Sequence, residues 1–422
     1  MRVLVLGGGG REHALCWALA RSGHEVLCGP GNAGIAEVAR VVALDAEDPE
    51  AVVAAARDEG ADLVVVGPEA PLVAGVADAL AAAGVPVFGP TAKGAAIEGS
   101  KAFAKAVMAE AGVPTAGYWT GTDAAEAKKA LDGFAPPYVV KADGLAAGKG
   151  VRICADRAEA EEAIDDAIVR RVFGEAGGTV VIEEFMTGPE VSLFGLCDGR
   201  TVVPMVPAQD FKRALDGDQG LNTGGMGAYS PVPAFTPAMV ADVRRDVLQP
   251  VLDALAARGI DYVGVLYAGL MLTPQGVKVL EFNARFGDPE TQVVLPRLRS
   301  DLGELLLACA TGRLAAFGPL EWDERACVTV IMASGGYPGD YRTGVPIGGL
   351  AEAAALEDVM VFHAGTRADA GQTVTAGGRV LAVSAFGDGV AAARERAYEG
   401  VDRIGFAGAH VRRDIAARPT GG

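Results

Sequence analysis

Residues 281–290, which read Glu-Phe-Asn-Ala-Arg-Phe-Gly-Asp-Pro-Glu, combine metal-binding and phosphate-binding side chains in one short tract. Side chains two apart in a strand point to the same face, so Glu281, Asn283 and Arg285 are expected to share one. Two hard oxygen ligands beside a guanidinium suit a magnesium–phosphate site. The alternative is an edge strand with a solvated polar face. Asn and Glu are depleted in strands, which favours a site.

A second tract, residues 141–150, reads Lys-Ala-Asp-Gly-Leu-Ala-Ala-Gly-Lys-Gly and joins two predicted strands. It is one residue short of a P-loop, it has Gly150 in place of Ser or Thr, and it does not lead into a helix. A glycine-rich flap between strands can close over a triphosphate with its backbone N–H groups facing the oxygens, and Lys141 would add an ammonium. A plain hairpin is the alternative, but two lysines beside three glycines offer little packing.

A third tract, residues 7–13, reads Gly-Gly-Gly-Gly-Arg-Glu-His between a predicted strand and a predicted helix. A dinucleotide-binding turn needs glycine at its sixth position and an acid after the second strand. Glu12 stands at the sixth position instead of glycine. Cys28-Gly-Pro-Gly31 follows the second strand without an acid, so both requirements fail. A helix N-terminus preceded by glycines remains, which suits a phosphate monoester. A tight turn that only packs helix on strand is the alternative.

The elements around these tracts predict three parts. Strands and helices alternate first, which predicts a parallel βαβ sheet (strands near 3–6, 25–28, 63–66 and 85–88, helices near 49–59 and 72–83). An α+β pattern follows from Ser100 (strands near 138–142, 151–154, 179–185, 262–272 and 277–282, and a long helix near 237–258). A third unit follows Gly318 (strands near 326–333 and 380–386, and a helix near 389–403). The tail from Arg418 is predicted to be disordered.

Composition restricts the partners. The 422 residues exceed the usual size of a single core, and a formal net charge of −17 repels nucleic acid and anionic membranes, so neither is an expected partner. Any phosphate site must therefore be built locally from Lys, Arg and backbone N–H groups. No apolar run reaches about 18 residues, the length of a membrane span. The six cysteines fit buried thiols in a reducing compartment, so a cytoplasmic location is expected.

Together these tracts resemble the ATP-grasp superfamily and, within it, the phosphoribosylamine–glycine ligases. The resemblance also rests on Gly31-Asn-Ala-Gly34, Val66-Gly-Pro-Glu-Ala-Pro-Leu72, Asn222-Thr-Gly-Gly-Met-Gly-Ala-Tyr-Ser230 and Gly335-Gly-Tyr-Pro-Gly-Asp-Tyr341, and it runs from about Arg2 to Arg413. It implies an α/β and α+β protein of three domains. They are an N-terminal βαβ domain for the substrate phosphate (1–100), an ATP-grasp domain with a small lid subdomain (101–318, lid about 115–190) and a C-terminal α+β domain (319–422).

The resemblance also implies a reaction of purine biosynthesis. ATP would phosphorylate the carboxylate of glycine, and the amine of 5-phosphoribosylamine would then displace phosphate from glycyl phosphate, with Mg²⁺ or Mn²⁺ bound. A lid that excludes water would protect the acyl phosphate. The protein is expected to be a monomer or a weak homo-oligomer. Two alternatives stay open: a carboxylase of the same superfamily that uses bicarbonate, and a nucleotide-binding oxidoreductase or regulatory module built on the first βαβ unit.

The resemblance assigns the ATP site and the metal site residue by residue. The ATP phosphates would contact Lys101, Lys141 and the flap residues Gly144, Gly148, Lys149 and Gly150. The nucleoside would contact Glu183, Glu184, Phe185 and, through its ribose, Glu190. The metal would be held by Glu281 and Asn283, and Arg285 would stabilise charge on the transferring phosphoryl group. Lys105, one turn beyond Lys101, is expected to lie in solvent.

The substrate sites follow in the same way. The glycine site is expected around residues 209–213 and 222–227, with Lys212 and Gly225 among its residues and either Asp210 or Asp288 facing the ammonium. The sugar phosphate is expected on Gly8, Gly9 and Gly10, with its hydroxyls or amine near Glu12, Asn32 or Glu69. The sequence departs from the family in three places: Gly8 replaces the usual Asn, Phe211 replaces a common His, and strand 263–272 contains no acid that could add a metal ligand.

Overall fold

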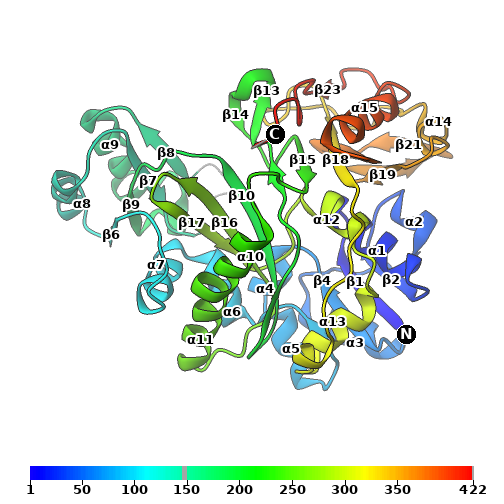
Figure 1. Cartoon of the computed structure of the whole chain (residues 1–422), viewed down its shortest axis with the longest axis horizontal. Helices are drawn as coiled ribbons and strands as arrows, with labels where there is room; N and C mark the ends of the chain where they lie inside the picture. Colours follow the sequence, from blue (N-terminus) through cyan, green and yellow to red (C-terminus); the bar gives the residue numbers. More distant parts are fainter. Residues whose placement is uncertain (145–149, 421–422) are drawn as a thin grey trace.

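A computed structural model describes residues 1–144 and 150–420, in which three sheet-centred parts are packed together (Figure 1). The first part is a five-stranded parallel sheet in the order β3-β2-β1-β4-β5, as the alternating pattern predicted. Its strands are β1 (Arg2–Gly7), β2 (Glu25–Pro30), β3 (Arg40–Val41), β4 (Leu63–Val66) and β5 (Val87–Phe88). Its helices are α1 (Gly10–Arg21), α2 (Ile35–Val38), α3 (Pro49–Asp58), α4 (Glu69–Val73), α5 (Val76–Ala82) and α6 (Ala92–Gly99).

The single helix predicted for 72–83 is wrong, because the chain breaks it into α4 and α5. Gly75 separates them with a left-handed φ of +84°, which glycine adopts without steric cost. α4 starts at Glu69, two residues after β4 (Gly67 and Pro68 lie between), so Glu69 lies at the carboxyl edge of the parallel sheet.

The second part contains two antiparallel sheets. The central sheet has the order β11-β10-β16-β17, made by β10 (Glu190–Asp198), β11 (Val202–Pro204), β16 (Val263–Thr273) and β17 (Gly276–Asn283). The smaller sheet has the order β6-β9-β7-β8, made by β6 (Tyr118–Gly121), β7 (Tyr138–Ala142), β8 (Val151–Cys154) and β9 (Val180–Glu184). Its short helical elements are α8 (Ala124–Ala130), η1 (Leu131–Gly133), α9 (Arg157–Ile164), η2 (Asp165–Val169) and η3 (Gly174–Gly177).

Further helical elements belong to the second part. They are α7 (Lys101–Glu110), α12 (Thr291–Arg297), α13 (Leu302–Ala310), the 3₁₀ turn η6 (Leu314–Ala316) and a run made of α10 (Pro237–Val243), η5 (Arg244–Leu248) and α11 (Gln249–Ala257). That run agrees with the long helix predicted for 237–258, except that η5 has π-helical hydrogen bonding. In the described ranges, no helix has the length and apolar character needed to cross a bilayer.

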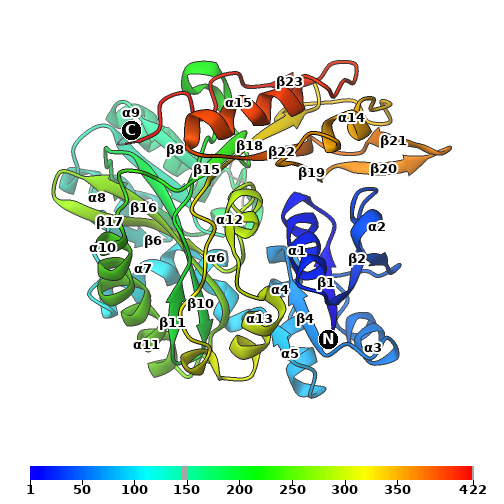
Figure 2. The ribbon, with the colours of Figure 1, turned by 45° about the vertical axis from the view of Figure 1, so that its right-hand side comes forward.

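The third part is a sheet in the order β12-β15-β18-β22-β19, with β23 paired to β18. Its strands are β12 (Gln209–Asp210), β15 (Gly227–Ser230), β18 (Ala326–Ala333), β19 (Val359–His363), β22 (Arg379–Gly387) and β23 (His410–Val411). Two hairpins, one short 3₁₀ turn and two helices accompany it: β13 (Arg213–Leu215), β14 (Gln219–Asn222), η4 (Asp216–Asp218), β20 (Thr366–Asp369), β21 (Gln372–Thr375), α14 (Leu350–Ala354) and α15 (Val390–Val401). Figure 2 shows β19 and the β20–β21 hairpin lying over α1 and α2 of the first part.

The predicted disorder from Arg418 is wrong for Thr420, whose amide donates to the Tyr229 hydroxyl at 2.8 Å and whose hydroxyl donates to Gln209 at 2.9 Å.

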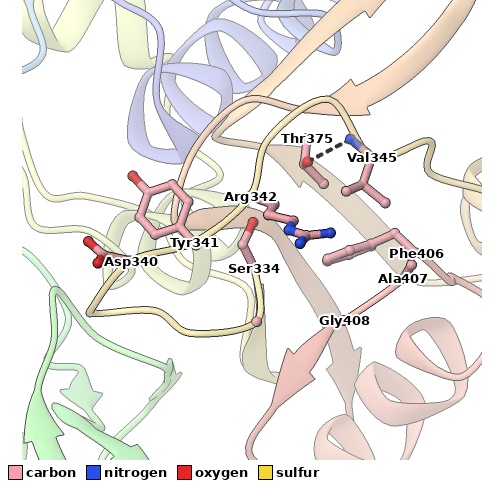
Figure 3. Close-up of a pocket in the computed structure, with 10 residues that line it drawn as sticks. Ser334, Asp340, Tyr341, Arg342, Val345, Thr375, Phe406, Ala407 and Gly408 are labelled. Atoms are coloured by element: carbon pink, nitrogen blue, oxygen red, sulfur yellow. Dashed lines mark hydrogen bonds between the residues drawn. The ribbon is translucent and has the colours of Figure 1, made fainter.

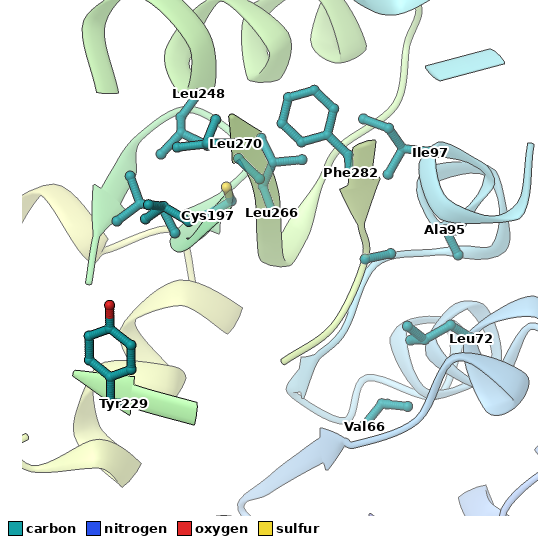
Figure 4. Close-up of a cluster of buried hydrophobic side chains, with 14 of the residues drawn as sticks. Val66, Leu72, Ala95, Ile97, Cys197, Tyr229, Leu248, Leu266, Leu270 and Phe282 are labelled. Carbon is teal, nitrogen blue, oxygen red and sulfur yellow. The ribbon is translucent and has the colours of Figure 1, made fainter. Parts of the chain in front are cut away.

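One apolar cluster joins the first and second parts (Figure 4). Val66 and Leu72 of the first part belong to the same cluster as Ile97 of α6 and Leu270 and Phe282 of the central sheet. All five side chains are at most 3% exposed. Because close-packed interiors resist small shifts, this core fixes the carboxyl edge of the parallel sheet relative to β17.

Candidate active site

Three strands of the central sheet present side chains to a common face. Ser192 on β10 lies opposite Gly269 on β16, and Gly269 lies opposite Glu281 on β17. In the next row Tyr267 lies opposite Asn283, so Glu281 and Asn283 share this face, as the alternation predicted. Arg285 was expected on the same strand, but β17 ends at Asn283 and Arg285 follows it.

Glu281 lies among positive charges. Burial by itself would raise the pKa of Glu281, but the neighbouring cations outweigh burial and lower that pKa. In decreasing strength these cations are Lys212, Lys141, Lys101 and Arg285. The structure thus brings residues from four separate tracts to one place, where the carboxylate is ionised and the surrounding charge suits phosphate oxygens.

A buried ionic cluster lies behind Lys141. Its Nζ is 2.9 Å from Glu183 Oε2, and Lys105 Nζ is 3.4 Å from Glu183 Oε1. Lys105 is only 2% exposed and donates to Thr115 Oγ1 at 2.8 Å, so the prediction of a solvated side chain was wrong. Burial lowers the pKa of Lys105 to about 8, although Glu183 opposes this shift. Glu184, the next residue along β9, is exposed.

The glycine-rich flap joins two antiparallel strands, as predicted: Lys141 on β7 lies opposite Val151 on β8. At its base, the Asp143 carboxylate accepts hydrogen bonds from Ser100 Oγ at 2.9 Å and from the Ala102 amide at 3.1 Å. Lys101 donates to the Gly144 carbonyl at 2.9 Å. The other flap residues of the predicted ATP site are Gly148 and Lys149, which lie outside the described residues, and Gly150, whose carbonyl accepts from the Ala142 amide at 2.8 Å.

The predicted nucleoside and glycine residues come from several elements. Glu190 begins β10 and forms an ion pair with Lys212 at 2.7 Å. Phe185 follows β9 and is half-buried. Asp210 ends β12, with Gly225 in the neighbouring loop. Gly225 has a φ of +111°, and a side chain there would overlap Pro289.

Arg285 connects this face to the parallel sheet. Its guanidinium is 2.8 Å from Glu98 on α6 and 3.4 Å from Glu69 on α4. Burial would lower the pKa of Arg285, but Glu98 and Glu69 raise it, so the guanidinium stays charged. Glu98 also accepts from the Ala284 amide at 2.8 Å. Glu98 was missed from the sequence, where it is one acid in an Ala- and Gly-rich helix with no motif around it.

The glycine loop before α1 is tightly organised. The Glu12 carboxylate is 2% exposed and accepts from the Gly9 amide at 2.6 Å and from Arg11 at 2.5 Å. The Asn32 amide nitrogen donates to the Gly8 carbonyl at 2.9 Å, while its oxygen accepts from the two amides that begin α2. A Cβ at Gly8 would lie 2.5 Å from the Gly31 carbonyl, so this backbone leaves no room for the Asn that the family usually has there.

Asp288 lies between this loop and the C-terminal sheet. Its carboxylate is 3.1 Å from Arg379 and accepts from Gln292 at 2.7 Å. Burial would raise the pKa of Asp288, but Arg379 and Arg11 outweigh it and the pKa is lowered. Asp288 is therefore already paired with a cation of the chain itself.

A cavity of about 580 Å³ lies elsewhere, in the C-terminal part (Figure 3). It is lined by the loop that carries Ser334, Asp340, Tyr341 and Arg342, by Thr375 and by the turn at Phe406. None of the predicted site residues lines it. The charged face of the central sheet, rather than this cavity, holds the predicted chemistry.

The residues of the face fit a hard divalent cation. Within the described ranges, no three or more His, Cys, Asp or Glu side chains gather as a metal cluster. Glu281 and Asn283 offer one carboxylate and one amide oxygen. Mg²⁺ is commonly bound through one or two carboxylates together with substrate phosphates and waters, so this small donor set suits it.

Comparisons with known proteins agree with this geometry. Residues 1–98, 99–291 and 327–418 match the N domain, the ATP-grasp (A) domain and the C domain of phosphoribosylglycinamide synthetase. The fold and the site together define an ATP-grasp enzyme. A phosphoribosylamine–glycine ligase of Streptomyces coelicolor is 57% identical over 425 residues that cover 100% of both chains. The chain belongs to the phosphoribosylamine–glycine ligase family of ATP-dependent, ADP-forming carbon–nitrogen ligases.

Solved structures support the same assignment. The crystal structure of a phosphoribosylamine–glycine ligase from Thermotoga maritima matches with a TM-score of 0.85 at 34% identity and covers 98% of this chain and 100% of that one. The biotin carboxylase domain of a Hydrogenobacter thermophilus 2-oxoglutarate carboxylase matches with a TM-score of 0.75, covering 97% of this chain and 91% of that one. At 17% identity that second likeness shows the fold alone. The carboxylase alternative is therefore not favoured.

Proposed function

We propose that this chain joins glycine to 5-phosphoribosylamine at the expense of ATP, giving glycinamide ribonucleotide, ADP and phosphate in purine biosynthesis. The observation that carries the proposal is the open face of the central sheet, where Glu281 lies among four cations. Relatives of this chain that share its full length are named for this reaction.

In the first step, ATP binds with its phosphates against Lys101, Lys141 and the flap. Glu281 and Asn283 would hold magnesium or manganese, which when bound neutralises phosphate charge and orients the terminal phosphoryl group. An oxygen of the glycine carboxylate attacks the γ-phosphorus, and the bond to the bridging oxygen breaks so that its electron pair leaves with ADP. Arg285 lies beside this position and stabilises the transferring charge.

In the second step, the amine of the sugar phosphate attacks the carbonyl carbon of glycyl phosphate. The carbon–oxygen bond breaks, inorganic phosphate leaves, and the nitrogen loses one proton. We place the sugar phosphate at the loop Gly8–Gly10 at the start of α1, in which the Gly9 amide already donates to Glu12, with Glu69 near the amine or hydroxyls. Glu12 and Asn32 already use their polar atoms within the loop, so we assign them to shaping it.

The remaining assignments complete the proposal. The strand end at Glu183–Phe185 lines the adenine pocket, and Glu190 accepts the ribose hydroxyls. The functional units are 1–100, 101–318 with a lid at about 115–190, and 319–422. We propose a cytoplasmic enzyme that is a monomer or a weak homo-oligomer and that binds neither nucleic acid nor membranes.

A coupled assay of ADP formation tests the function. ADP should form rapidly only when glycine and 5-phosphoribosylamine are both present with ATP and Mg²⁺, and bicarbonate should have no effect. Because the acyl phosphate forms inside a closed site, glycine alone should give only slow turnover. ADP formation driven by bicarbonate without glycine would assign the chain to the carboxylases instead.

A further inference from the structure

Arg412 is buried beside the C-terminal sheet and belongs to none of the roles above. It follows β23, and its side chain is 1% exposed. Its Nε and Nη2 donate to the two carboxylate oxygens of Asp414, each at 2.8 Å. Its Nη1 donates to the Arg213 carbonyl at 3.0 Å and to the Asp218 carboxylate at 2.9 Å. A planar guanidinium with these four hydrogen bonds is fixed in both position and orientation.

Arg412 contacts the residues on both sides of Lys212. It donates to the Arg213 carbonyl, and its guanidinium carbon lies 5.3 Å from the centroid of the Phe211 ring. A guanidinium within about 6 Å of a ring centroid is attracted to the face of that ring. The Phe211 ring also packs against Tyr229 of β15, with the ring centroids 6.2 Å apart. One buried side chain therefore restrains the chain immediately before and immediately after Lys212.

Residues 410–414 also fasten the β13–β14 hairpin, which lies beside the C-terminal end of the chain (Figure 1). The Gly217 amide in the turn of the hairpin donates to Asp414 at 2.8 Å, and the Arg413 amide donates to Asp216 at 2.7 Å. The fastening segment is itself part of the C-terminal sheet, because β23 pairs with β18. The C-terminal sheet thus holds the hairpin at its turn as well as at its first residue.

Lys212 lies at the centre of the proposed site. Its Nζ forms an ion pair with Glu190 at 2.7 Å, and among the four cations near Glu281 it acts most strongly on that carboxylate. Its ammonium is therefore close both to the residue proposed for the ribose and to a residue proposed for the metal. Groups that act in catalysis must be held within about 0.5 Å of their productive geometry. Because a lysine side chain is flexible, its backbone must be fixed if the ammonium is to stay in place.

We propose that Arg412 is a positioning residue for phosphoryl transfer, which holds the ammonium of Lys212 beside Glu281 by fixing the two neighbours of Lys212. This inference rests on the proposed function and deepens it, because it makes the C-terminal sheet a part of the ATP half of the reaction. Arg412 itself is too buried to touch a substrate, so its effect on the reaction passes through Lys212. A residue that acted only on stability would change the amount of folded enzyme and leave the kcat of the folded enzyme unaltered.

The test compares variants of two arginines that bind the same C-terminal segment. Arg412→Met keeps the aliphatic stem and removes the guanidinium, and the two acids that lose their partner are partly exposed, so the fold should tolerate the change. Arg394→Met is the matched control, because Arg394 on α15 donates to the carbonyls of Arg413 and Ile415 at 2.6 and 2.9 Å. Both carbonyls belong to the C-terminal segment and not to the neighbours of Lys212.

Arg412→Met should lower the kcat for ADP formation by roughly 10- to 100-fold, the loss expected when a catalytic group is misplaced by up to about 1 Å. The KM for 5-phosphoribosylamine should stay within about threefold of wild type, because that substrate is placed on the first part of the chain. Arg394→Met should keep kcat within about threefold of wild type. Arg412→Lys should recover only part of the activity, because an ammonium has three donors and cannot replace all four hydrogen bonds.

A double-mutant cycle separates positioning from independent support of the fold. If Arg412 acts through Lys212, adding Arg412→Met to Lys212→Met should lower kcat by less than about threefold further, because coupled residues give non-additive losses. Losses that multiply in the double variant would overturn the proposal. If Lys212→Met leaves no measurable turnover, the comparison of Arg412→Met with Arg394→Met decides, and equal kcat values in these two variants overturn the proposal.

These outcomes are distinguishable from a failure of the function itself. If wild type forms no ADP with glycine, 5-phosphoribosylamine and ATP, the proposed function fails and this inference fails with it. If wild type is active and Arg412→Met matches its kcat, or loses only affinity for 5-phosphoribosylamine, the positioning role alone is overturned. Thermal unfolding checks the folded state of each variant. If Arg412→Met is not folded, Arg412→Lys takes its place in every comparison.

Discussion

At the scale of single residues, the site depends on the charge balance around Glu281. Four cations approach this carboxylate, and they lower its pKa in spite of burial. Such an arrangement holds the acid ionised throughout the neutral range, which is the state that binds a metal. It also leaves an excess of positive charge for the phosphates of ATP.

Replacing Glu281 by Ala should therefore remove turnover and leave the fold intact. The side chain is surrounded by protein but lies on an open face that solvent reaches, so it contributes a ligand rather than core volume. We expect kcat for ADP formation to fall at least on the order of 100-fold, a loss of several kcal/mol of transition-state stabilisation. The free energy of unfolding should change by less than about 1 kcal/mol. Glu304→Ala is the matched surface control, and near-normal activity of Glu281→Ala at saturating magnesium would exclude the metal role.

Residues differ in how far their surroundings can be predicted from the sequence. The common face of Glu281 and Asn283 could be predicted, because strand alternation is a local property. The burial of Lys105 could not, because its partner Glu183 lies 78 positions along the chain on another element. Glu98 was missed for the same reason, since a helical pattern shows which side is polar but not that Arg285 faces it.

At the scale of elements, the strands were predicted more easily than their pairing. The hairpin of β7 and β8 was expected because both strands flank one short loop. The pairing of β12 with β15 and of β15 with β18 was not expected. Such pairing is set by contacts between residues distant in sequence. This pairing brings Asp210 to the active face.

The loop before α2 provides a test of packing between elements. Gly34 has an ordinary φ of −80°, so alanine is compatible with its backbone, but a Cβ there would overlap the His363 ring. Gly34→Ala should lower the free energy of unfolding by about 1–3 kcal/mol through overpacking. Gly99→Ala is the matched control, because no heavy atom would lie within 4 Å of its Cβ, and it should instead stabilise by about 0.5–1 kcal/mol. Urea denaturation measures both, and equal stability of the two variants would show that the loop does not pack on β19 in solution.

At the scale of the whole molecule, two histidines join the first and last parts of the chain. His13 lies on α1 and His363 ends β19, and the His363 amide donates to His13 Nδ1 at 2.7 Å. Burial, helped by the neighbouring His363, lowers the pKa of His13 to about 3, and burial lowers the pKa of His363 to about 4. Both rings are therefore neutral in the folded protein at any pH where the enzyme would work.

This contact predicts an acid-sensitive junction with a definite sign. In the unfolded chain these histidines titrate near 6.5, so below that pH the unfolded state binds more protons and stability falls as the pH falls toward 4. Above that pH the two histidines are neutral in both the folded and the unfolded state, so they add no pH dependence to the free energy of unfolding. His13→Asn keeps a hydrogen-bond acceptor but cannot titrate, so it removes the share of His13, about 2 kcal/mol between pH 7.5 and pH 5. Asn also loses the edge contact of the ring with Phe362, so the variant is expected to be less stable at every pH, and the change with pH is the informative quantity. Urea denaturation at the two pH values measures this change in the free energy of unfolding. If wild type and variant lose the same free energy between the two pH values, His13 is not buried against β19 in solution.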